Sequence, residues 1–283
     1  DVVDICTSTP THAPLAIQAM EAGCHVLTEK PMALNVKEAD EMIKVAKTRG
    51  VKLCVAHDML FSLATMRMRK YLERGALGSI LRVDIKQFRP PDVPALVNAQ
   101  HWMHTLPGGL VIGDAMVHPI YLARAILGDL EPTMAFTRKI GTIPHLSFDE
   151  AYVCLKGNQG VATIVTSYNS CGTAVIVDIF GTEMNLHCEL FNPILFRYKG
   201  QRSLMRDKNL SYVTQNLNRC LQIIQSTMYS GRKAILGQYG GNRIIIEKFA
   251  QSILNNTEPP VDAKDGRETV SIVEKVVKLC KDI

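Results

Sequence analysis

An acid and a base follow a short apolar run near the start of the chain. The segment HVLTEKPMAL (25–34) places Glu29 and Lys30 directly before Pro31. Strand ends in an α/β sheet are where such proteins hold ligands, so a fixed charge at this point can serve chemistry. A lysine there can polarise a substrate hydroxyl or carbonyl, and burial makes its pKa adjustable. In an exposed loop the same residues would be no more than solvated charges.

A second pair of chemically capable residues, Asp114 and His118, lies in GGLVIGDAMVHPIYLARAIL (108–127). Four residues apart, they fall on one face of a helix. Three interpretations are open. In the first, His118 is a general acid/base and Asp114 positions the substrate hydroxyl. In the second, the pair binds a metal together with His101 and His104. In the third, it is an ordinary helix pair. No further ligand stands at the spacing of a metal motif, so we predict no metal.

A polar turn near the N-terminus is the third group of interest. CTSTPTH (6–12) brings Thr7, Ser8, Thr9 and His12 to the end of an apolar strand, directly before a helix. A helix N-terminus favours negative charge, so the turn is suited to a phosphorylated ligand. The same residues can also serve only as the N-cap of the helix that begins near Pro14. Both interpretations can hold together.

Short strands and helices alternate over the first 60 residues. Each predicted helix has an apolar stripe or a glycine at its C-terminal end, which is typical of a helix packed on a sheet. The predicted strands are 1–5, 25–29 and 51–58, and the predicted helices are 13–23 and 35–50. Alternation of this kind with short loops indicates an α/β fold with a doubly wound parallel sheet.

The pattern of predicted secondary structure changes beyond residue 60. From about 80 to 200 the pattern is mainly that of strands, with a turn at KGNQG (156–160) that favours a hairpin. The predicted strands are 81–89, 133–140, 150–156, 161–169, 174–180, 184–190 and 194–199. The predicted helices are 62–78, about 109–127, 209–230, 241–255 and 267–281. We therefore predict two domains, 1–60 and 61–283, the second an α+β domain on a large, mostly antiparallel open sheet.

Composition excludes several classes of protein. The net charge is +5, and its one dense cluster (197–208) lacks the interleaved aromatic residues of a nucleic-acid surface. No apolar run approaches the roughly 18–20 residues of a membrane span, so we predict neither a nucleic-acid nor a membrane partner. Eight cysteines stand without a CxxC pair, which indicates reduced thiols in the cytoplasm.

Four blocks of the sequence resemble one known family. They are DVVDICTSTPTHAPLAIQAMEAGCHVLTEKPMA (1–33), GALGSILRVDI (75–85), PGGLVIGDAMVHPIYLARAILGD (107–129) and NNTEPPVDAKDGRETVSIVE (255–274). In this order they resemble the glucose–fructose oxidoreductase and inositol dehydrogenase family, often called Gfo/Idh/MocA. A lone Glu-Lys-Pro is a weak signal, whereas the blocks in family order span nearly the whole chain. The resemblance implies that residues 1–60 are the C-terminal part of a Rossmann domain.

The resemblance also implies an activity and a set of site residues. Members are NAD- or NADP-dependent dehydrogenases that move a hydride between a CH–OH carbon of a sugar, inositol or similar polyol and the nicotinamide. Their Lys-Pro bond is typically cis. The implied catalytic residues are Lys30, Asp114 and His118. The implied cofactor-binding residues are Thr7, Ser8, Thr9, His12, Glu29, Lys30 and Pro31. The implied substrate-binding residues are Lys30, Asp58, Trp102, Asp114, His118 and Tyr121.

The chain departs from the family pattern at several positions. Asp58 and Leu60 stand where members commonly carry Asn and Arg, Tyr121 replaces an Asp, and Ser8 replaces a Pro. Such changes leave room for an alternative, a catalytically silent sugar or nucleotide sensor on the same fold. No GxGxxG occurs in the 283 residues, so we expect a glycine-turn unit of about 60 residues to precede Asp1. The family's open sheet implies a homodimer or homotetramer.

Overall fold

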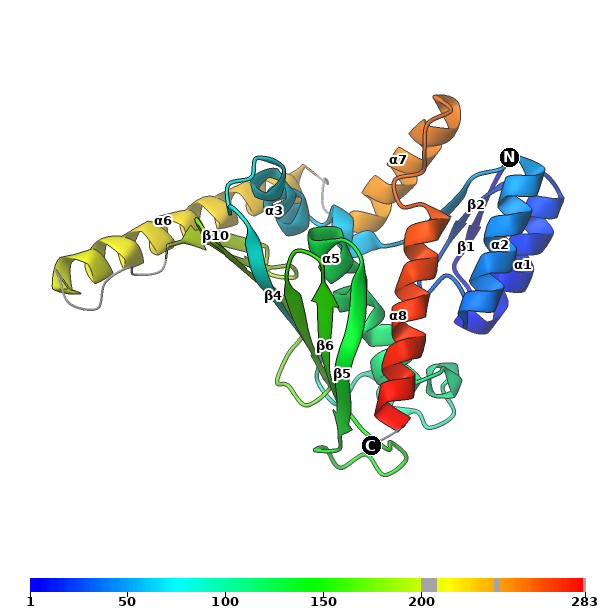
Figure 1. Cartoon of the computed structure of the whole chain (residues 1–283), viewed down its shortest axis with the longest axis horizontal. Coiled ribbons are helices and arrows are strands. Elements are labelled where there is room, and N and C mark those ends of the chain that lie inside the picture. The colour runs from blue at the N-terminus through cyan, green and yellow to red at the C-terminus, as the bar shows by residue number, and fades with distance from the viewer. Residues whose placement is uncertain (200–207, 237–239, 282–283) are drawn as a thin grey trace.

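The computed structural model describes residues 1–199, 208–236 and 240–281 and folds them around two sheets (Figure 1). The first sheet is parallel, with the order β1-β2-β3. Its elements are β1 (Val2–Ile5), η1 (Thr9–Thr11), α1 (His12–Glu21), β2 (His25–Thr28), α2 (Val36–Arg49) and β3 (Leu53–Val55). The predicted alternation of strands and helices over residues 1–60 is thus confirmed.

Helix α2 shows how local sequence sets these boundaries. The Asn35 side chain accepts a hydrogen bond from the Glu38 backbone N–H at 2.9 Å, and Glu38 in return accepts one from the Leu34 N–H at 3.0 Å. This arrangement satisfies N–H groups that the first turn leaves without partners. At the other end Gly50 adopts φ +64°, a left-handed conformation that glycine reaches at little cost. Both ends of the helix are therefore encoded locally.

The second sheet has seven strands in the order β10-β9-β8-β4-β7-β6-β5. Only the central β4–β7 pair is parallel, so the predicted mostly antiparallel sheet is confirmed. Gly157 N–H donates to the Gly160 carbonyl at 2.9 Å and closes the predicted hairpin. The strands are β4 (Ile80–Phe88), β5 (Leu130–Arg138), β6 (Glu150–Gly157), β7 (Val161–Ser167), β8 (Ala174–Gly181), β9 (Asn185–Glu189) and β10 (Ile194–Tyr198).

Helical elements pack on one face of this sheet. Strand β8 shows the consequence, since Val175 and Val177 are buried whereas Ile176 and Asp178 on the other face are partly exposed. The remaining elements are η2 (Asp58–Phe61), α3 (Leu63–Glu73), α4 (Pro94–Val97), η3 (Trp102–Thr105), η4 (Leu110–Ala115), α5 (Val117–Leu127), α6 (Lys208–Ile235), α7 (Gly241–Leu254) and α8 (Ala263–Lys281).

The helix predicted near 109–127 differs in two ways from expectation. Residues Leu110–Ala115 form a π-helix (η4), and only Val117–Leu127 form the α-helix α5. The window Leu110–Leu127 is also long and apolar enough to cross a membrane, contrary to the expectation that no run approaches that length. Within the described chain 89% of this window is buried, because it is the core helix against the second sheet.

Helix α8 joins the two sheets. It contacts α2 and β3 on one side and α5 and β5 on the other (Figure 1). Glu274 accepts the Val36 N–H at 2.7 Å, and Lys275 pairs with Glu131 at 2.6 Å. Buried side chains of both regions and of α8 form one apolar core. The last helix thus packs back on the N-terminal region, and the division of the chain at residue 60 stays a prediction.

Candidate active site

An ion pair lies between the end of β2 and the π-helix. Lys30 Nζ is 2.6 Å from Asp114 Oδ1, and their side chains are only 12% and 10% exposed. The two residues are 84 positions apart, so the contact exists only in the folded chain. The Lys30–Pro31 peptide bond is cis, as the resemblance implied. Glu29 Oε2 accepts the Lys30 backbone N–H at 3.1 Å and so helps to fix the loop that carries the lysine.

The π-helix brings Asp114 to this lysine. Gly108 and Gly109 precede it with φ +75° and +59°. A Cβ on Gly108 would lie 2.8 Å from side-chain atoms of both Ile112 and Val277, so only glycine permits this approach to α8. π-helical turns are rare and occur often at functional sites. The i,i+4 pairing expected of Asp114 and His118 is replaced by separate partners, because Asp114 contacts Lys30 and His118 contacts Tyr121.

A second network surrounds the hydroxyl of Tyr121. His118 Nδ1 is 2.8 Å from this hydroxyl, which also donates to Asp58 Oδ1 at 3.2 Å and accepts the Met59 N–H at 3.2 Å. Asp58 is the first residue of η2, which follows β3 and packs against α5. The tyrosine at a position where the family carries an aspartate therefore connects a carboxylate to the imidazole. His118 Nε2 makes no hydrogen bond within the described residues and is left for a ligand.

Burial and charge shift the pKa values of this network. Burial lowers the pKa of His118 well below its ordinary value, and the nearby cations Lys30 and Arg89 act in the same direction. Burial raises the pKa of Tyr121 well above its usual range. Burial also raises the pKa of Asp58, although the Tyr121 hydrogen bond and the charge of Lys30 oppose it. The imidazole is therefore neutral at physiological pH and available as a base.

A histidine that sequence reasoning missed supports the network. The His57 ring stacks on that of Tyr121 with centroids 4.2 Å apart and planes inclined by 15°. Burial, followed by the charges of Arg124 and Lys30, lowers the pKa of His57 to about 3. Its place directly after β3 was a signal, because strand ends in such sheets carry ligand-binding residues. Arg89, through its effect on His118, was missed as well.

The N-terminal turn lies at the end of β1, beside this lysine loop. His12 is buried, with Nδ1 2.8 Å from the Pro31 carbonyl and Nε2 3.0 Å from the Thr7 carbonyl. Its ring thus connects the turn to the loop. Thr9 Oγ1 is buried and has no hydrogen-bond partner among the described residues, whereas the Thr7 hydroxyl accepts a bond from Thr11. An unpartnered hydroxyl at this strand end, next to the start of α1, is suited to a polar cofactor.

Two other sequence-predicted features lie in and beside η3, which packs against the π-helix η4. Trp102 is on η3, where its ring is 5.7 Å from that of His101. His104 packs edge-on against His145 rather than beside Asp114. Within the described residues no group of three His, Cys, Asp or Glu side chains is arranged to hold a metal ion. Ser8 precedes η1 and makes no side-chain capping bond.

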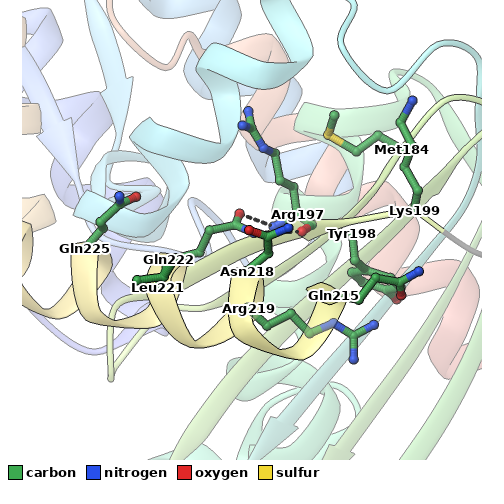
Figure 2. Close-up of a pocket in the computed structure, with 10 residues that line it drawn as sticks. All are labelled: Met184, Arg197, Tyr198, Lys199, Gln215, Asn218, Arg219, Leu221, Gln222 and Gln225. Carbon is green, nitrogen blue, oxygen red and sulfur yellow. Dashed lines mark hydrogen bonds between the residues drawn. The ribbon is translucent and has the colours of Figure 1, made fainter. Parts of the chain in front are cut away.

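A large cavity lies away from this cluster. It has a volume of about 670 Å³ and is a groove between β10 and α6, lined by Arg197, Tyr198, Arg219 and several amide side chains (Figure 2). A smaller cavity of about 170 Å³ borders Asp58 and Ser62. We place the candidate site at the Lys30–Asp114 pair and the Tyr121 network rather than at either cavity, because the ion pair and the shifted pKa values gather there.

Comparison with known proteins places these features in a family. A model described as "Oxidoreductase family, NAD-binding Rossmann fold" (GFO_IDH_MocA) matches residues 1–57, and one for the GFO/IDH/MocA C-terminal domain matches 65–187. The uncharacterized oxidoreductase YrbE of Bacillus subtilis is 24% identical over 94% of this chain and 72% of its own length. Levoglucosan dehydrogenase of Pseudarthrobacter phenanthrenivorans is 33% identical over 47% of this chain and 35% of its own.

Solved structures share the fold. The UDP-N-acetylglucosamine 3-dehydrogenase GnnA of Acidithiobacillus ferrooxidans superposes with a TM-score of 0.72 at 22% identity, over all of this chain and 79% of its own. The WlbA dehydrogenase of Bordetella pertussis, solved with NADH and UDP-GlcNAcA, gives 0.76 at 17%, over all of this chain and 78% of its own. Among the relatives found by sequence, myo-inositol 2-dehydrogenase of Thermotoga maritima is 25% identical over 65% of this chain and 54% of its own length.

Proposed function

Because the chain belongs to the GFO/IDH/MocA oxidoreductase family, with the NAD-binding Rossmann fold at its N-terminal end, we propose that it is an NAD(P)-dependent dehydrogenase of sugars or polyols. Relatives named levoglucosan dehydrogenase and myo-inositol 2-dehydrogenase support this substrate class. The single observation that carries the proposal is the buried Lys30–Asp114 pair beside a neutral His118. We assign Lys30, Asp114 and His118 the catalytic roles.

The cofactor fits the residues at the ends of β1 and β2. Thr9 offers a buried hydroxyl that lacks a partner among the described residues, and the start of α1 favours the negative charge of a dinucleotide. Thr7, Ser8 and Glu29 would complete the contacts, with His12 and Pro31 holding the two loops together. When bound, the nicotinamide accepts or returns the hydride.

Side chains of the protein carry out the proton transfer. The Tyr121 hydroxyl donates its proton in a hydrogen bond to Asp58. Its oxygen is therefore the acceptor in the hydrogen bond with His118, so Nδ1 carries a proton and donates it to this bond. The tautomer with hydrogen on Nδ1 leaves a lone pair on Nε2, which removes the substrate hydroxyl proton. Lys30 stabilises the oxygen on which negative charge develops, and Asp114 holds the lysine in place. Asp58, Trp102 and Tyr121 complete the substrate site in this proposal.

The location and assembly of the protein are part of the same proposal. All eight cysteines are unpaired, which favours a reducing cytoplasm. The open face of the seven-stranded sheet carries the stacked rings of Phe136 and Tyr152, 4.6 Å apart, and Phe136 is 42% exposed. Two copies that pack these faces together would remove the rings from water, giving a homodimer or homotetramer.

A substrate panel tests the activity directly. Sugars and polyols are offered with NAD or NADP, and formation of the reduced cofactor is followed by its absorbance. Lys30→Met and His118→Asn should each lower turnover by roughly 10²–10⁴-fold, the loss expected for a positioned acid/base or charge. Lys44→Met, which alters an exposed lysine on α2, is the matched control and should retain full turnover. Binding of sugars with no turnover by the unaltered protein would instead favour the silent sensor.

A further inference from the structure

Helix α6 lies along the edge strand β10 and turns a polar face toward it. Gln222 accepts the Arg197 N–H at 2.9 Å and donates to the Arg197 carbonyl at 3.1 Å (Figure 2). The Ser226 hydroxyl accepts the Leu195 N–H at 3.2 Å and donates to the Leu195 carbonyl at 2.9 Å. These side chains satisfy backbone groups that a neighbouring strand would otherwise pair. The helix therefore covers the open edge of the sheet.

The opposite face of the same helix is apolar and points away from its own chain. Ile224 is two positions from both Gln222 and Ser226, and two residues turn an α-helix by about 200°. Spacings of three, four and seven residues keep the other apolar side chains on that outer face. We call these residues the α6 stripe. They are 54–88% exposed: Val213, Leu217, Leu221, Ile224, Met228 and Ile235.

The exposed apolar area reaches the upper end of what monomeric proteins show. At these exposures the six side chains leave an apolar surface on the order of 600 Å², and the largest patch on a typical monomer, which is often functional, is about 300–600 Å². Among the described residues none covers this surface, since α6 extends outward from the body beyond β10 (Figure 1). Such a surface, which runs along much of a helix about 42 Å long, indicates a partner.

We infer that the α6 stripe is a contact between two copies of this chain, paired antiparallel about Ile224. Two facing stripes would bury on the order of 1,200 Å² in total, which reaches the lower bound of a stable protein interface. A two-fold axis makes one self-complementary patch sufficient, so no second surface is needed. This surface lies on a helix rather than on the open sheet face and is independent of the proposed dehydrogenase activity.

The sequence of α6 fits this antiparallel register. Pairing about Ile224 places Leu217 of one copy opposite Gly231 of the other. The leucine side chain can therefore pack into the space that the glycine leaves open. The helix carries no acidic residue, and like charges would repel if they met across the axis. In this register Arg232 faces Asn216, whereas Arg219 lies against Tyr198 of its own chain on the inner face, so no two cations oppose each other.

A membrane surface is the less favoured occupant. Helices that lie in a membrane interface carry lysine and arginine beside their apolar face. Here the residues that flank the stripe are mainly uncharged, among them Asn216, Asn218, Gln225 and Thr227. Amides and hydroxyls can hydrogen-bond to a second copy of the helix, whereas they add little attraction to anionic lipid.

The mass of the assembly in solution tests the inference. Leu217→Glu combined with Ile224→Glu places charges in the centre of the stripe, on exposed positions that the fold does not use. Light scattering after size exclusion should show the assembly mass fall twofold relative to the unaltered protein. Leu254→Glu changes an 84% exposed leucine on α7 and should leave the mass as it was. An unchanged mass in the double variant would overturn the inference, as would co-sedimentation with anionic phospholipid vesicles that the double variant loses.

Cross-linking tests the register. In a Cys220→Ser background, Ile224→Cys lies on the two-fold axis and should form a disulfide between copies under mild oxidation. Leu217→Cys sits on the same stripe but faces Gly231 of the other copy, so it should cross-link at least tenfold less. Equal yields at the two positions would contradict the antiparallel pairing. Circular dichroism of each variant confirms that α6 still forms.

Discussion

The hydroxyl of Tyr121 determines what the imidazole of His118 can do. It sits within hydrogen-bond reach of Nδ1, of the Asp58 carboxylate and of the Met59 N–H. A carboxylate only accepts hydrogen bonds, so the hydroxyl proton goes to Asp58 and Nδ1 must carry its own proton. Nε2 is then a free base. A side chain that departs from the family pattern thereby takes a positioning role.

Tyr121→Phe tests this role. It removes the acceptor for Nδ1–H, so the tautomer with hydrogen on Nε2 becomes populated and turnover should fall about tenfold or more. Nitrogen-15 NMR of the imidazole reports the tautomer without any substrate. Tyr71→Phe is the control, because its ring packs under Arg197. It should change neither the turnover nor the imidazole spectrum. If the imidazole spectrum of Tyr121→Phe matches that of the unaltered protein, the hydroxyl does not set the tautomer.

The lowered pKa of His118 predicts the acid limb of the pH profile. The neutral base persists until the pH falls below its depressed pKa, so kcat/KM should stay level through about pH 6.5, where an ordinary histidine titrates. The decline should begin only at lower pH. Rates measured at saturating cofactor across this range would reveal it. A midpoint at or above the ordinary histidine value would show that another group is the base.

The buried His57 makes stability depend on pH. Its pKa is about 3 in the folded protein and about 6.5 when unfolded, so between these values the unfolded chain binds more protons. Stability is therefore lost as the pH falls through this window, by up to about 1.4 kcal/mol per pH unit. His57→Phe keeps a ring against Tyr121 without a titration. Urea unfolding at about pH 7 and pH 5 should show roughly 2 kcal/mol less acid destabilisation in the variant; equal losses would contradict it.

Elements are held in place by close backbone contacts at their ends. The start of α7 packs on η2, the short helix that begins with Asp58. A Cβ at Gly241 would lie 2.1 Å from the Asp58 carbonyl oxygen, which no side chain permits. The glycine thus sets the distance between α7 and the segment after β3 that carries Asp58. Local sequence gave no sign of this contact, because the two residues are distant in the chain.

Gly241→Ala measures that contact. The added methyl must push α7 and η2 apart, so unfolding free energy should fall by about 1–3 kcal/mol. Gly172→Ala is the matched control, since its Cβ would meet no atom within 4 Å, and it should change stability by less than about 0.5 kcal/mol. Denaturant titration of both variants gives the comparison. Equal stability of the two would mean that the backbone yields at little cost.

Across the molecule, α8 makes the two sheets depend on each other. Its side chains contribute to the same apolar core as those of α2 and α5, and its ion pairs reach Asp40 on one side and Glu131 on the other. The chain just before α8 also pairs with β3, where the Val55 N–H donates to the Val261 carbonyl at 3.2 Å. A helix shared in this way couples the unfolding of both regions.

Ile272→Ala tests the coupling. The side chain is 2% exposed within α8, and its truncation should cost about 2–5 kcal/mol. Trp102, the only tryptophan, reports the second region, while far-ultraviolet circular dichroism reports all helices. Both signals should unfold in one transition and shift together in the variant. Separate transitions would show that the sheets unfold independently.

Local pattern determined much of this protein. Apolar periodicity and turn residues predicted nearly every strand and helix, because side-chain alternation and capping are written within a few residues of each element. The Glu-Lys-Pro block and the Asp114 and His118 pair indicated a candidate site, because a strand end and a four-residue helical spacing can be recognised within a short segment. The π-helix escaped prediction, since its extra residue per turn is stabilised by contacts such as Gly108 with α8 rather than by its own sequence.

Only the tertiary structure decided which of these residues meet. Lys30 pairs with Asp114, which is 84 positions away. Tyr121 lies only three positions from His118, but its hydroxyl also reaches Asp58, which is 63 positions away. The pKa values depend on burial, which no short segment encodes, because it is created when α5 packs between the two sheets. The sequence therefore named the groups that can do chemistry, and the packing of distant elements decided their partners and their charge.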